Sequence, residues 1–356
     1  MIGDRIKQAR KASGLSLRAL AENAGITAMA ISKYENNKST PSSGVLLGLA
    51  RALDLKVEYF FRTSKVELHD IEYRKHSKLP KKVLAQIEGD VIEQIERFID
   101  LEKFLPNSPI EDFTLPKELP SEIEDYDDIE SIADIVRKAW KLGGNSIPDL
   151  MDTLEERGIR VFQTKAFHND KFDGLTAEVN EFHVIVVGRD WPGDRQRFTL
   201  SHELGHLILK GRLPPHLDDE KAANRFAGAF LAPKAEVLKE LGSNRNWLEP
   251  VELHLLKQTY GLSMGAWIYR ASDLGILNKS ATQKMWRYFR ERNWIKVEPG
   301  GQYSPEVPKL FKQLIFHAYA EQLISESKAA ELLAWPTSTF RTIRNKVSCE
   351  QEALNQ

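Results

Sequence analysis

The stretch RFTLSHELGHLILK occupies residues 197–210 and contains two histidines, His202 and His206, four residues apart. On a helix, residues four apart lie on one face, so both imidazoles can bind one metal ion. Glu203 lies beside them, where a carboxylate can act on a water held by that ion. The residues that flank the histidines are largely apolar, which predicts a helix buried in a core. They are Leu200, Leu204, Leu207, Ile208 and Leu209.

A second predicted helix, DDEKAANRFAGAFLAP at 218–233, contains further oxygen ligands. Glu220 follows His206 by fourteen residues and begins an E-x-x-A-N pattern. This pattern resembles that of the gluzincin group of zinc peptidases. The resemblance implies that Glu220 is the third zinc ligand and that Asn224 supports a ligating histidine from the second shell of the metal. Asp218 and Asp219 are the competing candidates for the third ligand.

Three blocks in order, RQRFTLSHELGH, ANRFAGAFLAP and LKQTYGLSMGAWIYRASDLGIL, resemble the ImmA/IrrE family of metallopeptidases over residues 130–280. The resemblance implies Zn²⁺ as cofactor and cleavage of a repressor protein. It also implies a frequent association with Cro-like domains, and some members are regarded as antitoxin components. With zinc bound, Glu203 is expected to be the catalytic base. Tyr260, Tyr269 and His216 remain open as candidates for stabilising an oxyanion.

The stretch SLRALAENAGITAMAISKYENN at 16–37 has the spacing of a helix-turn-helix, with Gly25 at the turn. It resembles the phage-repressor, Cro-like (XRE-type) domains over the first 62 residues, and the second helix of such a domain enters the major groove. Leu17 departs from the family, which often has a base-contacting Gln there. The alternative is a helical bundle that contacts only proteins. Carried over by position, the expected DNA contacts are Arg18, Thr27, Ala28, Met29, Ser32, Lys33, Asn37 and Lys38.

The patterning predicts a mainly α-helical chain with an α+β peptidase domain, in which a small sheet packs on the active-site helix. The expected strands are IRVFQT, GLTAEV and FHVIVV, with a hairpin turn at Asn180-Glu181 whose strands could pair with a substrate. The predicted regions are a helix-turn-helix domain at 1–65, a connecting helix with an acidic, proline-rich linker at 66–128, the peptidase domain at 129–280, and a helical region at 281–356. In the last region, SKAAELLAWPTSTFR is consistent with a second, degenerate helix-turn-helix.

The charges are balanced overall, with 50 Lys and Arg against 51 Asp and Glu, which argues against a protein that coats nucleic acid generally. Residues 1–65 instead carry eleven Lys and Arg against five acids, as expected of a domain that faces DNA phosphates.

The single cysteine, Cys349, and the absence of a signal peptide or a long apolar run predict a cytoplasmic protein without a membrane span. Because Cro-like domains read two-fold sites, a homodimer is expected, with its interface near the helix at 83–104.

Two functions follow as hypotheses. The first is a regulator that binds double-stranded operator DNA and whose zinc site cleaves a repressor or its own linker at 106–128. The second is an antitoxin-like repressor without proteolytic activity, in which the peptidase fold docks a toxin partner and the DNA-binding domain regulates the operon.

Overall fold

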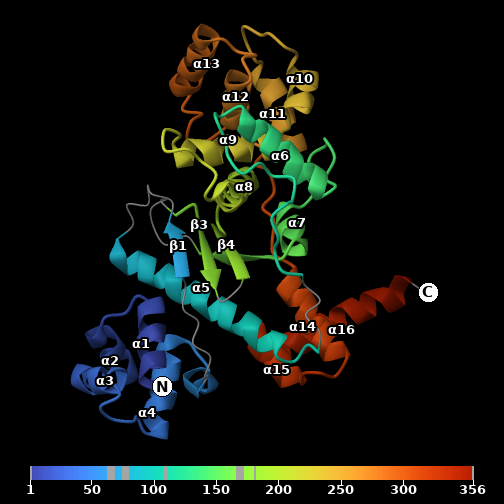
Figure 1. The fold of residues 1–356 in the computed structure, drawn as a ribbon. Helices are drawn as coiled ribbons and strands as arrows, with labels where there is room; N and C mark the ends of the chain where they lie inside the picture. Colours follow the sequence, from blue (N-terminus) through green and yellow to red (C-terminus); the bar gives the residue numbers. More distant parts are fainter. Residues whose placement is uncertain are drawn as a thin grey trace. The chain divides into compact units, whose positions relative to one another are not determined.

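The computed structural model describes residues 2–61, 69–73, 80–106, 111–165, 172–179 and 182–354. Contacts divide the chain into two units (Figure 1). Unit 1 comprises residues 1–70, 77–109 and 309–356, and unit 2 comprises residues 71–76 and 110–308. Within the described residues no helix is both long and apolar enough to span a membrane.

Unit 1 is helical, and its N-terminal part is a bundle around a core that includes Ile6, Leu20, Ile31 and Leu49. Each of these side chains comes from a different helix, and all four are fully buried. The elements of the unit are α1 (Ile2–Ala12), α2 (Leu17–Ala24), α3 (Ala28–Glu35), α4 (Ser43–Leu53), the 3-10 helix η1 (Val57–Phe61), α5 (Lys81–Glu102), α14 (Leu310–Ala320), α15 (Glu326–Leu332) and α16 (Thr337–Leu354).

The connecting helix α5 uses its apolar face inside unit 1. Ile87, Val91, Ile95 and Phe98 are at most 3% exposed, and the helix contacts α1, α14 and α15. A buried ion pair between Arg5 of α1 and Glu96 adds to this packing. The stripe is therefore covered by the chain itself, and a homodimer with its interface near this helix stays a prediction.

The helices α15 and α16 are separated by residues 333–336 and contact each other. Trp335 and Pro336 lie in this break, and α16 has 18 residues, so the second, degenerate helix-turn-helix suggested for this region stays a prediction. Lys328 of α15 forms an ion pair of 2.5 Å with Asp100 of α5, so this end of the chain packs on the connecting helix.

Unit 2 is an α+β domain, as the sequence predicted, with a small sheet packed on the helix of the two histidines. Its helices are α6 (Asp128–Ala139), α7 (Leu150–Glu156), α8 (Gly193–Leu209), α9 (Asp219–Leu231), α10 (Lys234–Leu241), α11 (Pro250–Tyr260), α12 (Met264–Asp273) and α13 (Lys279–Glu291). Its strands are β2 (Ile159–Thr164), β3 (Gly174–Val179) and β4 (Phe182–Gly188), and β1 (His69–Tyr73) completes the sheet.

The sheet has the order β1-β3-β4-β2. β2 runs parallel to β4 with Ile159 opposite His183, and β3 runs antiparallel to β4 with Gly174 opposite Val187. Because β3 and β4 both lie inside this order, the hairpin does not offer the free edge that was expected for a substrate. The expected turn at Asn180-Glu181 lies outside the described residues.

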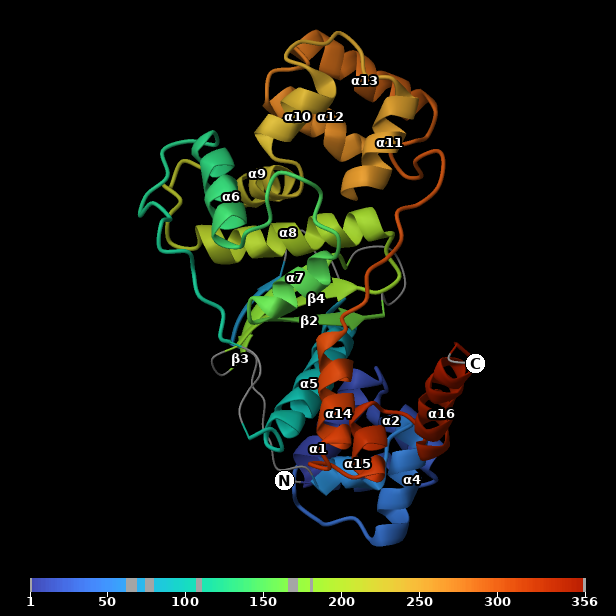
Figure 2. The same cartoon turned by 90° about the vertical axis from the view of Figure 1, so that its right-hand side faces the viewer.

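Helix α8 lies between the sheet on one side and α9 on the other (Figure 2). Gly205 makes the close approach to α9 possible, because a Cβ there would meet the Ala223 Cα and the Phe226 ring at 3.2 Å. On the sheet side, a Cβ at Gly174 would meet the Thr199 side chain at 2.6 Å. Small residues on both sides therefore hold α8 in a narrow space, and nearly all of it is buried.

The acidic, proline-rich segment has no helix or strand over residues 111–127, as expected. It is nevertheless not a solvated linker, which corrects the sequence-based expectation. Ile123 is 2% exposed and belongs to the core of unit 2, and its backbone N–H donates to the Arg212 carbonyl. Phe113, Leu119 and Tyr126 pack against the same core. The apolar residues spaced through the segment outweigh its prolines and acids.

The segment after α13 crosses unit 2 and is attached by two carboxylates, the half-buried Glu298 and the buried Glu306. Glu298 accepts hydrogen bonds from the backbone of Met264 and Gly265 at the start of α12. Glu306 pairs with the buried Arg197 of α8 and accepts the backbone N–H groups of residues 150 and 151 at the start of α7. Both carboxylates therefore neutralise the positive end of a helix.

Candidate functional site

The helix-turn-helix is formed by α2 and α3, with Gly25 between them in the left-handed conformation (φ 67°). Thr27 begins α3 as its N-cap, because its side chain accepts the Ala30 N–H at 3.2 Å. An ion pair of 2.6 Å between Arg10 of α1 and Glu35 anchors the far end of α3. The second helix is thus capped at its start and fixed at its end.

The residues that are expected to contact DNA differ in their exposure to solvent. Met29 is 69% exposed, and the side chains of Arg18, Thr27, Lys33 and Lys38 are also exposed. Ala28 and Ser32 are half-buried.

Two further positions of this domain are engaged in packing. Asn37 has a φ of 54°, accepts the Gly3 N–H at 3.2 Å and lies 3.4 Å from Asp4, so part of its polar capacity is used within the domain. Leu17 packs against the core of the bundle, which gives this departure from the family a structural role.

His202, His206 and Glu220 come together in unit 2, with their possible ligand atoms within 4.8 Å of one another. The Nε2 atoms of the two histidines are 3.0 Å apart. The Glu220 carboxylate lies 3.5 Å from His202 Nε2 and 3.9 Å from His206 Nε2. The histidines come from one face of α8, and Glu220 comes from the first turn of α9, so the crossing of these helices creates the cluster.

These separations fit a tetrahedral zinc ion. Ligand atoms about 2.1 Å from such an ion lie roughly 3.4 Å from one another, and each of the three distances is within about half an ångström of that value. Two imidazoles and one carboxylate are also a donor set that zinc uses where a position is left for water or substrate. The cluster is suited to a catalytic rather than a closed structural site.

The second ring nitrogen of each histidine meets an acceptor from α9. His202 Nδ1 is 2.9 Å from Asn224 Oδ1, and His206 Nδ1 is 3.3 Å from an Asp219 carboxylate oxygen. Such contacts keep the proton on Nδ1 and leave Nε2 free to bind a metal. The sequence pointed to this function for Asn224, but it missed Asp219 as the partner of His206. Asp218 instead caps α9 by accepting the Lys221 N–H at 2.9 Å.

Glu203 lies on the sheet side of α8 and is 1% exposed. Thr176 of β3 donates a hydrogen bond of 2.7 Å from its hydroxyl to the Glu203 carboxylate. Sequence reasoning missed Thr176. The two-residue spacing of Gly174 and Thr176 places both on one face of β3, but nothing in the sequence identifies α8 as the neighbour of that face.

The three candidates for oxyanion stabilisation are found in different surroundings. Tyr260 is buried, donates to Glu240 at 3.2 Å and stacks edge-on with Trp267. Burial, followed by the charge and hydrogen bond of Glu240, raises the pKa of Tyr260 to about 12. Tyr269 is 61% exposed and lies against Trp286, and His216 is exposed. The hydroxyl of Tyr260 is thus already used in a hydrogen bond to Glu240.

Two family models match the chain. Residues 6–60 match the model described as "Helix-turn-helix", and residues 154–272 match a peptidase-family model described as "IrrE N-terminal-like domain". The first match includes α2 and α3, and the second includes the sheet strands β2 to β4 and the helices α8 and α9.

The chain is 38% identical to the HTH-type transcriptional regulator SinR of Bacillus subtilis (strain 168) over 108 residues, which are 29% of this chain and 94% of SinR. It is 42% identical to the uncharacterized HTH-type transcriptional regulator RP497 of Rickettsia prowazekii (strain Madrid E) over 60 residues, 17% of this chain and 46% of that protein.

Among solved structures, the chain matches ComR from S. thermophilus in complex with DNA and its signalling peptide ComS. The match has 15% identity and a TM-score of 0.17 over 99% of this chain and 97% of that one. Since the chain covers nearly all of SinR, it belongs to the family of HTH-type transcriptional regulators, and it carries an IrrE N-terminal-like domain of a peptidase family behind the helix-turn-helix.

Proposed function

We propose that the chain is a DNA-binding regulator whose unit 2 is a zinc-dependent endopeptidase, and that it cleaves a repressor protein or itself. The observation that carries the proposal is the convergence of His202, His206 and Glu220 at distances that fit zinc, with a buried carboxylate next to them. The peptidase-family match over residues 154–272 supports the same reaction class.

His202, His206 and Glu220 would hold the ion, and Asn224 and Asp219 would orient the two imidazoles. When bound, zinc lowers the pKa of water toward neutrality and polarises the carbonyl of a scissile peptide bond. The fourth position, which the three side chains leave to water and substrate, is where such a bond would be attacked.

Glu203 is the proposed general base. Its carboxylate would accept the proton of the attacking water and deliver it to the leaving amine. Thr176 holds one oxygen of this carboxylate through its hydroxyl, so it would fix the side chain in one orientation. Because Glu203 is almost fully buried, the proton would be exchanged without competition from bulk water.

Replacement of Glu203 by Gln is expected to abolish cleavage while zinc binding persists, since the amide keeps the shape but cannot accept the proton. The rate should fall by about 10²- to 10⁴-fold. Wild-type and Glu203→Gln chains are incubated with and without double-stranded DNA and read by intact mass. In parallel, new protein N-termini are enriched from host cells that produce either chain.

A set of termini that appears with the wild type and not with Glu203→Gln supports the peptidase and identifies its substrate. Glu291→Gln, at an exposed position on α13, is the matched control and should behave as the wild type. Identical termini for Glu203→Gln and the wild type, with regulation in the cell unchanged, would contradict the proposal. That outcome would favour the binding protein that docks a toxin partner.

Replacement of Thr176 by Val should slow cleavage by roughly 10- to 100-fold, because a hydrogen bond to a charged group contributes about 1.5–3 kcal/mol. Thr176→Ser retains the hydroxyl and should restore most of the rate. Turnover of the identified bond and zinc content are measured for both variants. A merely structural role for Thr176 would be indicated if Val and Ser slowed the reaction equally, or if zinc were lost together with activity.

For unit 1, we propose that α3 reads double-stranded DNA, with Lys33 on the phosphates and Met29 near base edges. Lys33→Ala should reduce the slope of log affinity against log salt by about 1, whatever the sequence of the duplex. Met29→Ala should change the preferred sequence and leave that slope unaltered. Both are measured by fluorescence anisotropy on duplexes selected from a random pool by the wild-type chain.

Lys239→Ala removes one exposed charge from unit 2 and is the control. If this substitution lowers the slope as much as Lys33→Ala does, binding is non-specific charge attraction and the assignment of α3 is wrong.

A further inference from the structure

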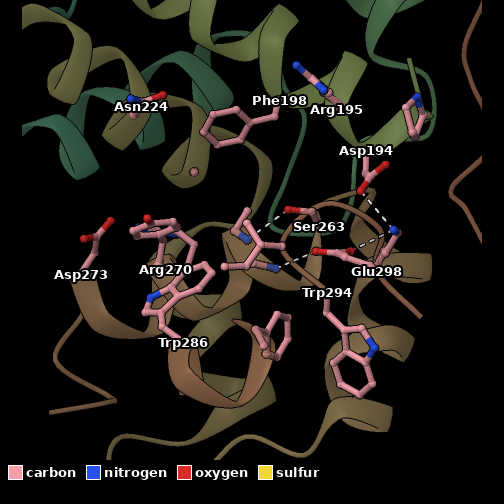
Figure 3. A pocket seen from close by; sticks show the side chains of 18 of the residues that line it. Asp194, Arg195, Phe198, Asn224, Ser263, Arg270, Asp273, Trp286, Trp294 and Glu298 are labelled. Carbon is pink, nitrogen blue, oxygen red and sulfur yellow. Dashed lines mark hydrogen bonds and ion pairs between the residues drawn. The ribbon is translucent and has the colours of Figure 1, made fainter. Parts of the chain in front are cut away.

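A cavity of about 870 Å³ lies in unit 2, between α8 and α9 on one side and α12 and α13 on the other. Figure 3 shows Phe198 of α8 across the cavity from Trp286 of α13 and Trp294. The volume is in the range of sites that bind small molecules and cofactors. We call it the aromatic cavity, defined by Phe198, Asn224, Tyr269, Trp286 and Trp294.

The aromatic cavity is separate from the metal cluster. None of His202, His206 or Glu220 lines it, although Asn224 does. Asn224 contacts His202 at Nδ1, whereas the proposed metal is on the Nε2 side of the same ring. A molecule in the cavity would therefore lie behind the ligating histidine and would touch neither the ion nor Glu203, whose carboxylate contacts β3.

The aromatic side chains that line the cavity favour the binding of a flat aromatic ring. Tyr269 and Trp286 have ring centroids 4.8 Å apart at 48°, and Phe289 contacts both Trp286 and Trp294 at 5.5–6.1 Å. Trp286, Trp294 and Phe198 are only half-buried, so ring surface remains available to a ligand. A further aromatic group stacked on such surfaces, or a cation placed over a ring face, would be stabilised.

The polar lining selects the charge of the ligand. Arg225 and Arg270 lie 2.7 Å and 2.5 Å from the carboxylate of Glu130, and Arg195 pairs with Asp173 at 2.6 Å. These buried or partly buried cations are therefore already paired with acids, and Arg225 also lies 3.4 Å from Asp273 of the cavity lining.

At the other end, Lys257 is shared between Asp194 at 3.2 Å and Glu298 at 2.9 Å, and both of these carboxylates are labelled in Figure 3. Burial opposes the charge of Lys257, but its contacts with Glu298 and Asp194 outweigh burial and raise its pKa. Two carboxylates around one ammonium leave a net negative charge at this end of the cavity, while two further lysines of the lining, Lys221 and Lys296, are exposed to solvent.

Asp194 also presents an acceptor atom with no partner. Its side chain is 6% exposed and lines the cavity, and its Oδ1 makes no hydrogen bond within the described part of the chain. A buried carboxylate oxygen without a donor is costly, and a donor from a ligand would remove that cost.

We propose that the aromatic cavity binds a small amphipathic amine, a molecule with a flat aromatic body and one positively charged nitrogen. The body lies between Phe198 and Trp286, and the nitrogen donates to Asp194. The site gives the regulator an input for a small molecule, and it does not depend on the proposed peptidase reaction.

The test uses tryptamine as probe and indole-3-acetate as its charge-reversed counterpart, each measured by equilibrium dialysis against the purified full-length chain. Tryptamine should occupy one site per chain and bind about tenfold or more tightly than indole-3-acetate. Trp286→Ala should weaken tryptamine binding by about tenfold. Trp247→Ala removes an aromatic ring that stacks on Tyr288 outside the cavity lining, so it should leave binding unchanged.

Asp194→Asn should remove the preference for tryptamine over indole-3-acetate. If that variant does not fold, the comparison of the two probes on the wild type still decides the charge. The proposal is overturned by indole-3-acetate binding as tightly as tryptamine, by equal effects of the two tryptophan variants, or by no saturation below about 1 mM.

Discussion

The close crossing of α8 and α9 is the constraint on which the rest of unit 2 depends. Gly205 lets the two helices approach until a Cβ would contact Ala223, and this approach brings Glu220 to within 4 Å of both histidines. The same helix pair supplies Asn224 and Asp219 to the outer nitrogens of the imidazoles. A larger residue at 205 would separate the helices and with them the ligands of the proposed metal. On the opposite side of α8, the sheet contributes Thr176 to the proposed base.

The packing also separates the chemical tasks within unit 2. Glu203 lies on the sheet side of α8, the possible metal ligands gather on the side that faces α9, and the N-terminal half of α8 lines the aromatic cavity. Asn224 belongs to both the possible metal site and the cavity, because it contacts His202 and also lines the cavity. A regulator with a helix-turn-helix, a proposed zinc peptidase and a proposed amine site would connect DNA, a protein substrate and a small molecule in one chain.

Sequence reasoning predicted the parts of the molecule that local patterns specify. The strands at 159–164, 174–179 and 182–188 lie where the patterning predicted them, within one residue, and α8 and α9 cover most of the two stretches that were predicted to be helical. The approach of Glu220 to the histidines was expected from the resemblance of its E-x-x-A-N pattern to that of the gluzincin group. The contacts of Thr176, Glu306 and Asp194 could not be predicted, because each depends on which distant segment packs against it. The burial of Ile123 was missed for a related reason, since proline and acid content dominates a local reading of that segment.

The measurement that tests the central claim most directly is the metal content of the purified full-length chain, by elemental analysis after dialysis. We expect about one zinc per chain in the wild type and in His317→Ala, which removes an exposed histidine of unit 1, and little in His202→Ala or Glu220→Gln. Circular dichroism shows whether each variant remains folded. Zinc retained in folded His202→Ala and Glu220→Gln, or absent from the wild type even after incubation with zinc, would contradict the assignment of this cluster as a metal site.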